Sequence, residues 1–259
     1  MGTAGSSTSS AYGGHSIESS FFTICAVIMA LIIVAGFSIN LAMGRSTFAV
    51  PAIFHFHAFV FFGWVALYVA QSFSIARGNI RLHRKMGRLA YVFIPAMVVL
   101  GTAISVTSLR RTGAPFFFDQ REFMFSNVLM LLLFAILAIS ALRAPRSTGW
   151  HPRLMLTGMA LLVNPGVGRL LPMPYMIPYA WLGTTMLILI FPVAGMIADK
   201  RRTGRVHPAW AWGVGAIILT QIIADILAFS DLGAAVTQAV VEGTPGAQRP
   251  MEAFLPPGF

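Results

Sequence analysis

Three histidines each follow a short basic segment and precede a long apolar run. The segments are R-G-N-I-R-L-H-R-K, R-S-T-G-W-H-P-R and R-R-T-G-R-V-H-P-A, which contain His83, His151 and His207. Imidazoles on facing helices can ligate haem iron, and three imidazoles can hold a metal ion that keeps one open position for water. This chemistry requires the three side chains to converge. If they point outward, they contact headgroups or loop carbonyls.

A fourth histidine belongs to a polar row inside an apolar run. His57 and Gln71 are 14 residues apart with Trp64 between them, so they share one face of a helix. We predict that this face looks into a helical bundle. His57 is the candidate haem ligand at one side of the membrane, and two of the other three histidines are the candidates at the opposite side.

Two charged residues lie in apolar runs, where ionisable groups are costly and are usually paired or functional. Arg169 and Asp225 each lie 18 residues after a histidine, His151 and His207 respectively. That spacing is about five helical turns, so each pair shares a face. We predict that Arg169 and Asp225 lie at similar depth and can pair, with Asn164 and Gln221 nearby. The alternatives are a purely structural ion pair and two side chains that reach the headgroups.

The composition predicts a membrane protein that is entirely α-helical. Of 259 residues, 57% are hydrophobic and 10% are charged, against about 25% charged in soluble domains. A helix needs roughly 20 apolar residues to cross a bilayer. Seven runs qualify, and none alternates as a barrel strand does: 20–42, 54–76, 88–109, 123–142, 154–170, 176–198 and 209–230. We also predict that Pro95 and Pro192 interrupt their helices and that residues 164–169 unwind.

The basic residues predict an orientation. Twelve of the 18 Lys and Arg residues lie within 77–88, 143–153 and 200–205, which makes these loops cytoplasmic. Seven crossings then place the N-terminus inside and the C-terminus in the periplasm. The net charge of +10 is therefore assigned to anionic headgroups rather than to nucleic acid.

The predicted organisation is a flexible polar tail (1–19), a seven-helix transmembrane domain (20–230) and a periplasmic C-terminal tail (231–259), whose order the sequence leaves open. The single cysteine, Cys25, excludes an internal disulfide and covalent haem attachment through a C-x-x-C-H motif. Both lysines lie in loops, so no helix offers a Schiff base for retinal.

One stretch carries a resemblance. H-A-F-V-F-F-G-W-V-A-L-Y-V-A-Q-S, from His57, followed by L-H-R-K-M-G-R, ending at Arg88, resembles bacterial multi-pass membrane proteins of unknown function. These carry a His…Trp…Gln helix followed by an H-R-x-x-G-R helix start. W-H-P-R-L-M-L and G-R-V-H-P resemble later parts of such proteins. The resemblance covers about residues 50–230 and implies a bacterial inner membrane and a seven-helix plan, with no activity.

Two functional hypotheses follow. The first is a non-enzymatic accessory or structural subunit of a bacterial membrane complex, which the scarcity of intramembrane charge and the Phe- and Met-rich runs favour. The second is a membrane redox protein that binds haem b through histidines among His57, His83, His151 and His207. A metal-dependent hydrolase or a transporter comes third, and no metal ligands are assigned.

Overall fold

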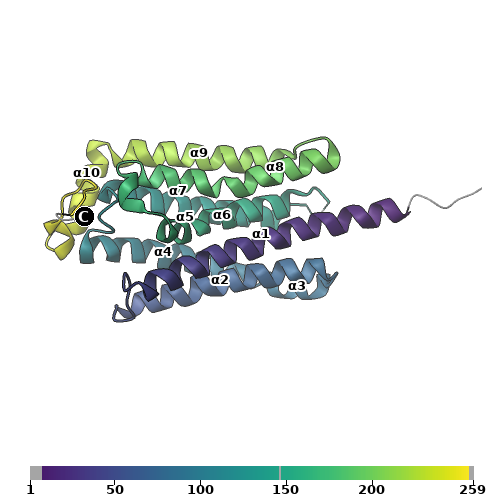
Figure 1. Ribbon diagram of the computed structural model, residues 1–259, viewed down its shortest axis with the longest axis horizontal. Coiled ribbons are helices and arrows are strands. Elements are labelled where there is room, and N and C mark those ends of the chain that lie inside the picture. The colour runs from purple at the N-terminus through teal and green to yellow at the C-terminus, as the bar shows by residue number, and fades with distance from the viewer. Residues whose placement is uncertain (1–7, 146, 257–259) are drawn as a thin grey trace, which may run out of the picture.

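The apolar runs fold into a bundle of roughly parallel and antiparallel helices (Figure 1). The computed structural model describes residues 8–145 and 147–256. Helix makes up 79% of the chain, with no strand among the described residues, because apolar surroundings require backbone groups to pair within their own segment. The α-helices are α1 (Thr8–Ala42), α2 (Ala52–Ala76), α3 (Ile80–Gly87), α4 (Ala90–Thr112), α5 (Gln120–Arg143), α6 (Trp150–Leu170), α7 (Ala180–Ile188), α8 (Ile190–Thr203), α9 (Pro208–Ala228) and α10 (Asp231–Val241); two short 3₁₀ helices are η1 (Met173–Met176) and η2 (Pro245–Gln248).

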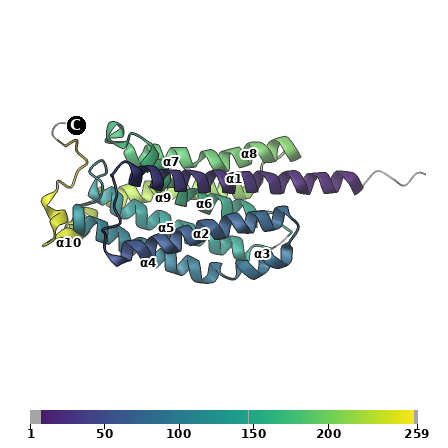
Figure 2. The same ribbon diagram turned by 60° about the horizontal axis from the view of Figure 1, so that its bottom comes forward.

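The bundle has two distinct ends (Figures 1 and 2). The start of α1 projects beyond one end, where α3 and the junction between α8 and α9 also lie, and the C-terminal segment covers the other. We call them the histidine end and the C-terminal end. Helix α1 begins at Thr8, inside the segment predicted as a polar tail, and residues 1–7 of that segment lie outside the described residues.

Six helical segments are long and apolar enough to cross a membrane: Glu18–Ala42, Ala52–Ala76, Ala90–Thr112, Gln120–Arg143, Ala180–Thr203 and Pro208–Ala228. The fold is therefore that of a multi-pass membrane protein. Helix α6 corresponds to the one remaining segment of the seven that were predicted to span the membrane. It has 21 residues and packs against α1, α5, α7, α8 and α9, but it is not among the six because it carries more polar residues.

A close crossing of α1 and α6 holds the centre together. A Cβ on Gly166 would lie 2.9 Å from the Cα of Ile33, so only glycine allows this approach. The prediction that residues 164–169 unwind is wrong, since α6 continues through Pro165 to Leu170. Packing against α1 holds the segment helical, and Arg169 Nη1 donates to the Pro165 carbonyl at 2.8 Å.

Pro192 accounts for the interruption between α7 and α8. Its ring conflicts with the carbonyl four residues earlier, which belongs to Ile188, the last residue of α7. Pro95 does not interrupt α4 in the same way, because α4 runs through it from Ala90 to Thr112. In α8, Gly195 faces the ring of Trp210, leaving no space there for a side chain. Trp210 is fully buried as a result.

The C-terminal segment is ordered up to residue 256 and caps the ends of α4 and α5. The Arg249 guanidinium donates to the carbonyls of Gly113, Ala114, Pro115 and Phe118. Gln120 donates through its backbone N–H to the Met251 carbonyl at 2.8 Å. Backbone carbonyls at the end of α4 thus find donors in a segment far along the chain.

Candidate functional site

Two of the three histidines from the basic segments face each other at the histidine end. His83 on α3 and His151 on α6 have ring centroids 6.0 Å apart and planes at 87°. His151 Nδ1 lies 2.8 Å from the Ala141 carbonyl, which can only accept, so Nδ1 carries the proton. In this tautomer Nε2 is bare, and a bare imidazole nitrogen is the form that ligates a metal.

Helix α3 brings His83 to this position. Asn79 caps α3 by accepting from the Leu82 N–H at 3.0 Å, and one face of the helix carries exposed Arg81, Arg84, Lys85 and Arg88 around a surface hollow of about 490 Å³. Burial lowers the pKa of the His83 imidazole below its usual value, and the neighbouring His151 and Arg84 lower it further. His83 is consequently neutral at neutral pH.

His207 does not join this pair. It is the N-cap of α9, where Nδ1 accepts from the Ala209 N–H at 3.1 Å. Its other nitrogen, Nε2, donates to the Thr148 carbonyl at 2.7 Å. Both ring nitrogens are used by the backbone, so the convergence of all three histidines that a three-imidazole metal site requires does not occur, and only two of them meet.

The polar face of α2 points into the bundle. Trp64 is 3% exposed and packs edge-on against Phe134, with centroids 5.3 Å apart. Buried atoms without a hydrogen-bond partner occur at His57 Nδ1, Trp64 Nε1 and Gln71 Oε1. We call these three residues the α2 row. His83 Nδ1, one turn before Gly87 on α3, is unpartnered as well.

Unpartnered atoms of this kind call for an explanation, because burying a polar group without a partner costs about 1–3 kcal/mol. Six such side-chain atoms occur among the described residues, and four belong to α2 and α3. These four residues are also the His, Trp, Gln and His of the stretch that carries the resemblance.

His57 lies far from the other histidines. The helical rise separates it from Gln71 by about 21 Å along α2, and its ring stacks on Phe61 with centroids 4.0 Å apart. Since His83 is near the Gln71 end of α2, His57 cannot share one small ligand with the His83–His151 pair.

The predicted pairing of Arg169 with Asp225 does not form. The Arg169 guanidinium lies over the Phe37 ring of α1, 3.9 Å from its centroid. Asp225 instead accepts from Gln221 Nε2 at 2.7 Å, and Gln221 Oε1 accepts from Trp181 Nε1 at 2.8 Å. Gln221 and Asp225 therefore meet as predicted. Arg169 instead packs on α1 and donates a hydrogen bond to the carbonyl of Pro165, the residue after Asn164.

A buried charge network at the histidine end was not predicted from the sequence. Arg153 donates to both Asp199 oxygens at 2.7 and 2.8 Å and to Glu18 at 3.0 Å. Trp210 Nε1 donates to Asp199 at 2.8 Å, and Arg202 completes the group with Glu18 at 2.7 Å. We call these five residues the arginine network. Its signal in the sequence was Asp199, the only acidic residue between Glu122 and Asp225.

No family model, curated protein or solved structure matches this chain. Within the described ranges, no group of three or more His, Cys, Asp or Glu residues is arranged to hold a metal ion. The two-histidine arrangement of His83 and His151 is consequently the strongest candidate for ligand chemistry, and the α2 row extends from it.

Proposed function

We propose that this protein is a bacterial inner-membrane redox subunit that binds haem b between His83 and His151. The observation that carries the proposal is the pair of imidazoles from α3 and α6 with ring centroids 6.0 Å apart. If His83 and His151 held one iron, each through a nitrogen about 2 Å from the metal, their rings would need a separation of this order. A haem held there supplies a one-electron couple within the membrane.

The surrounding residues fit such a group. His151 keeps its Nε2 bare through the hydrogen bond of Nδ1 to Ala141, and His83 has an unpartnered buried nitrogen. A Cβ on Gly87 would lie 3.1 Å from the Gln71 amide nitrogen, so glycine at this position lets α3 pack closely against α2 beside His83. Arg84, Lys85 and Arg88 are exposed on α3 and offer cations to the carboxylates that haem carries.

The proposed topology has seven crossings, with α6 as the additional span. The start of α1 and the described C-terminal segment lie at opposite ends of the bundle (Figure 1), and this supports an odd number of crossings. The exposed cations of α3 and the end of α8 lie at the histidine end, which supports a cytoplasmic N-terminus, a periplasmic C-terminus and contact with anionic headgroups at the inner face.

The test is the absorption spectrum of protein purified from haem-sufficient cells, with a matched set of variants. We expect a Soret band and reducible α and β bands in the wild type, and their loss in His83→Ala and in His151→Ala. His207→Ala is the control, because that histidine comes from an equivalent basic segment but both of its ring nitrogens are hydrogen-bonded to the backbone. It is expected to keep the spectrum.

A colourless wild-type protein that also fails to take up added haemin would overturn the proposal. The non-enzymatic accessory subunit is then the remaining hypothesis, and co-purification with a larger complex supports it. Bands that survive both His83→Ala and His151→Ala would likewise show that this pair is not the ligand set.

A further inference from the structure

A groove on the outside of the bundle, near the histidine end, has the form of a lipid site. It encloses about 670 Å³ between α5, the start of α6 and α9. Its wall on α5 runs from Leu133 to Ala144, and Trp212 and Ala216 form its wall on α9. Apart from Ser140 and Thr148, the side chains that line it are apolar or aromatic.

The dimensions of the groove match one leaflet of a bilayer. The eleven-residue separation of Leu133 and Ala144 corresponds to about 16 Å along a helix, and half of the hydrocarbon core is about 15 Å. Trp150 lines the mouth, and Trp212 is 70% exposed. Tryptophans at this position are typical of the boundary between hydrocarbon and headgroups, so the groove has the length and the depth for one acyl chain.

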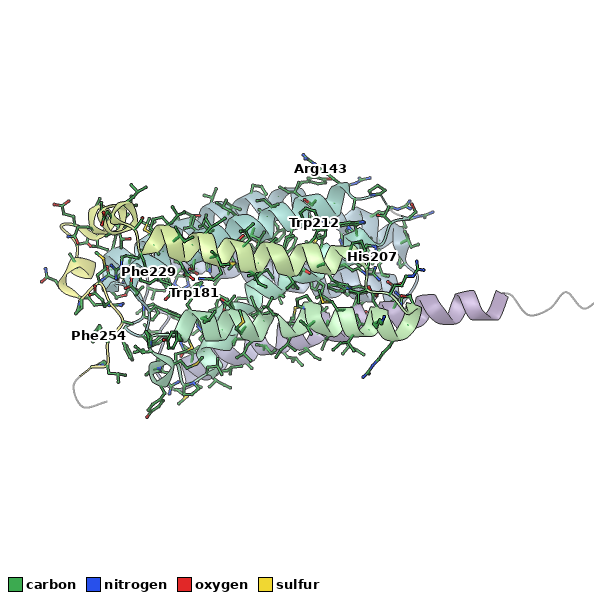
Figure 3. The ribbon with its side chains drawn as sticks, turned by 90° about the horizontal axis from the view of Figure 1, so that it is seen from above. Arg143, Trp181, His207, Trp212, Phe229 and Phe254 are labelled. Atoms are coloured by element: carbon green, nitrogen blue, oxygen red, sulfur yellow. The ribbon has the colours of Figure 1, made fainter. Side chains whose placement is uncertain are left out.

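The mouth of the groove is positive. Arg143, in the last turn of α5, is exposed beside it, and Figure 3 shows Arg143, Trp212 and His207 in the same half of the bundle. The first turn of α6 has no side-chain cap and no acidic residue, so its N–H groups and dipole favour an anion. No acidic residue occurs between 123 and 198.

We infer that this groove binds one anionic phospholipid, with an acyl chain between α5 and α9 and the phosphate near Arg143 and the start of α6. The charge at the mouth selects an anionic headgroup over a zwitterionic one, and the apolar walls hold the chain. The inference does not depend on haem, because it uses neither imidazole of the His83–His151 pair.

Native mass spectrometry of the full chain with added phosphatidylglycerol or phosphatidylcholine tests the inference. We expect the wild type to retain phosphatidylglycerol in preference. Arg143→Gln should lower that retention about five-fold, in line with roughly 1 kcal/mol per basic residue near an anionic surface. Arg201→Gln, an exposed cation elsewhere at the histidine end, should leave it unchanged.

A second pair of variants tests the chain-binding part of the groove. Ala216→Phe fills it and should reduce the retention of both lipids, whereas Leu219→Phe on the exposed side of α9, at a residue that is 58% exposed, should not. Equal retention of the two lipids by the wild type, or equal losses in Arg143→Gln and Arg201→Gln, would overturn the inference.

A measurement on the unaltered chain removes any dependence on how the variants fold. Trp64, Trp181 and Trp210 are at most 5% exposed, so lipids with brominated acyl chains should quench mainly Trp150 and Trp212. We expect brominated phosphatidylglycerol at low mole fraction to quench more strongly than brominated phosphatidylcholine. Identical quenching by the two lipids contradicts a selective site.

Discussion

Two groups of buried polar residues lie on opposite sides of the bundle and differ in how their atoms are satisfied. The arginine network joins α1, α6, α8 and α9, and its Asp199 receives donors from Arg153, Arg202 and Trp210. The α2 row, on the other side (Figure 1), leaves a buried atom without a partner in each of its three residues. The arginine network therefore joins its helices through paired charges, whereas these three atoms of the α2 row add no hydrogen bond to the bundle.

The contrast has a physical basis. A buried ion pair is tolerated only when its geometry is good and its remaining donors and acceptors are also bonded, and the network meets both conditions. Unpartnered polar atoms lower stability, so they persist where another requirement acts on the chain. The arginine network is therefore expected to stabilise the bundle more than the α2 row does.

The largest effect is expected from Asp199→Ala. It leaves the buried Arg153 guanidinium without its bidentate partner, and breaking a buried pair costs about 3–5 kcal/mol. Unfolding in a series of SDS and detergent mixtures, followed by circular dichroism, measures the change. Glu242→Gln, at an exposed acidic residue, is the control. If Asp199→Ala lowered the free energy of unfolding by less than about 1 kcal/mol, the arginine network would not be a major source of stability.

A matched pair of tryptophan variants tests the contrast directly. Trp210→Phe removes the donor to Asp199, and hydrogen bonds to charged groups contribute about 1.5–3 kcal/mol. Trp64→Phe removes an N–H that has no partner. Removing this unpaired buried donor is favourable and offsets part of the packing lost with the larger ring, so we expect the free energy of unfolding to change by at most about 1 kcal/mol. The same SDS unfolding measures both variants, and equal losses would erase the distinction between the two groups.

The smallest effect is expected from pH. The His83 pKa is lowered in the folded protein, so the unfolded chain binds more protons once the pH falls below about 6.5. Stability should then be full above that pH, decline as the pH falls from there towards the folded-state pKa, and level off below it. Thermal midpoints between pH 5 and 8 in detergent measure it, with His83→Gln expected to flatten the slope. A wild-type slope that His83→Gln leaves intact would assign the effect to another group.

The sequence alone determined the membrane class, because long apolar runs and scarce charge leave helices as the available structure. It also placed His57, Trp64 and Gln71 on one inward face, since helical spacing fixes which residues share a face. These are local properties, set by periodicity and by hydrogen bonds within a few residues.

Only the tertiary structure decided which residues meet across helices. The pairing of His83 with His151, the separation of Arg169 from Asp225 and the bonding of Arg153 to Asp199 depend on how helices far apart in sequence pack. The crossing of α1 and α6 at Gly36 and Gly166 and the fit of Trp210 against Gly195 set that packing. The helical period specifies which residues share one face of a helix. It carries no information about which helix that face will contact, because the side-chain volumes at the contacts determine how the helices pack.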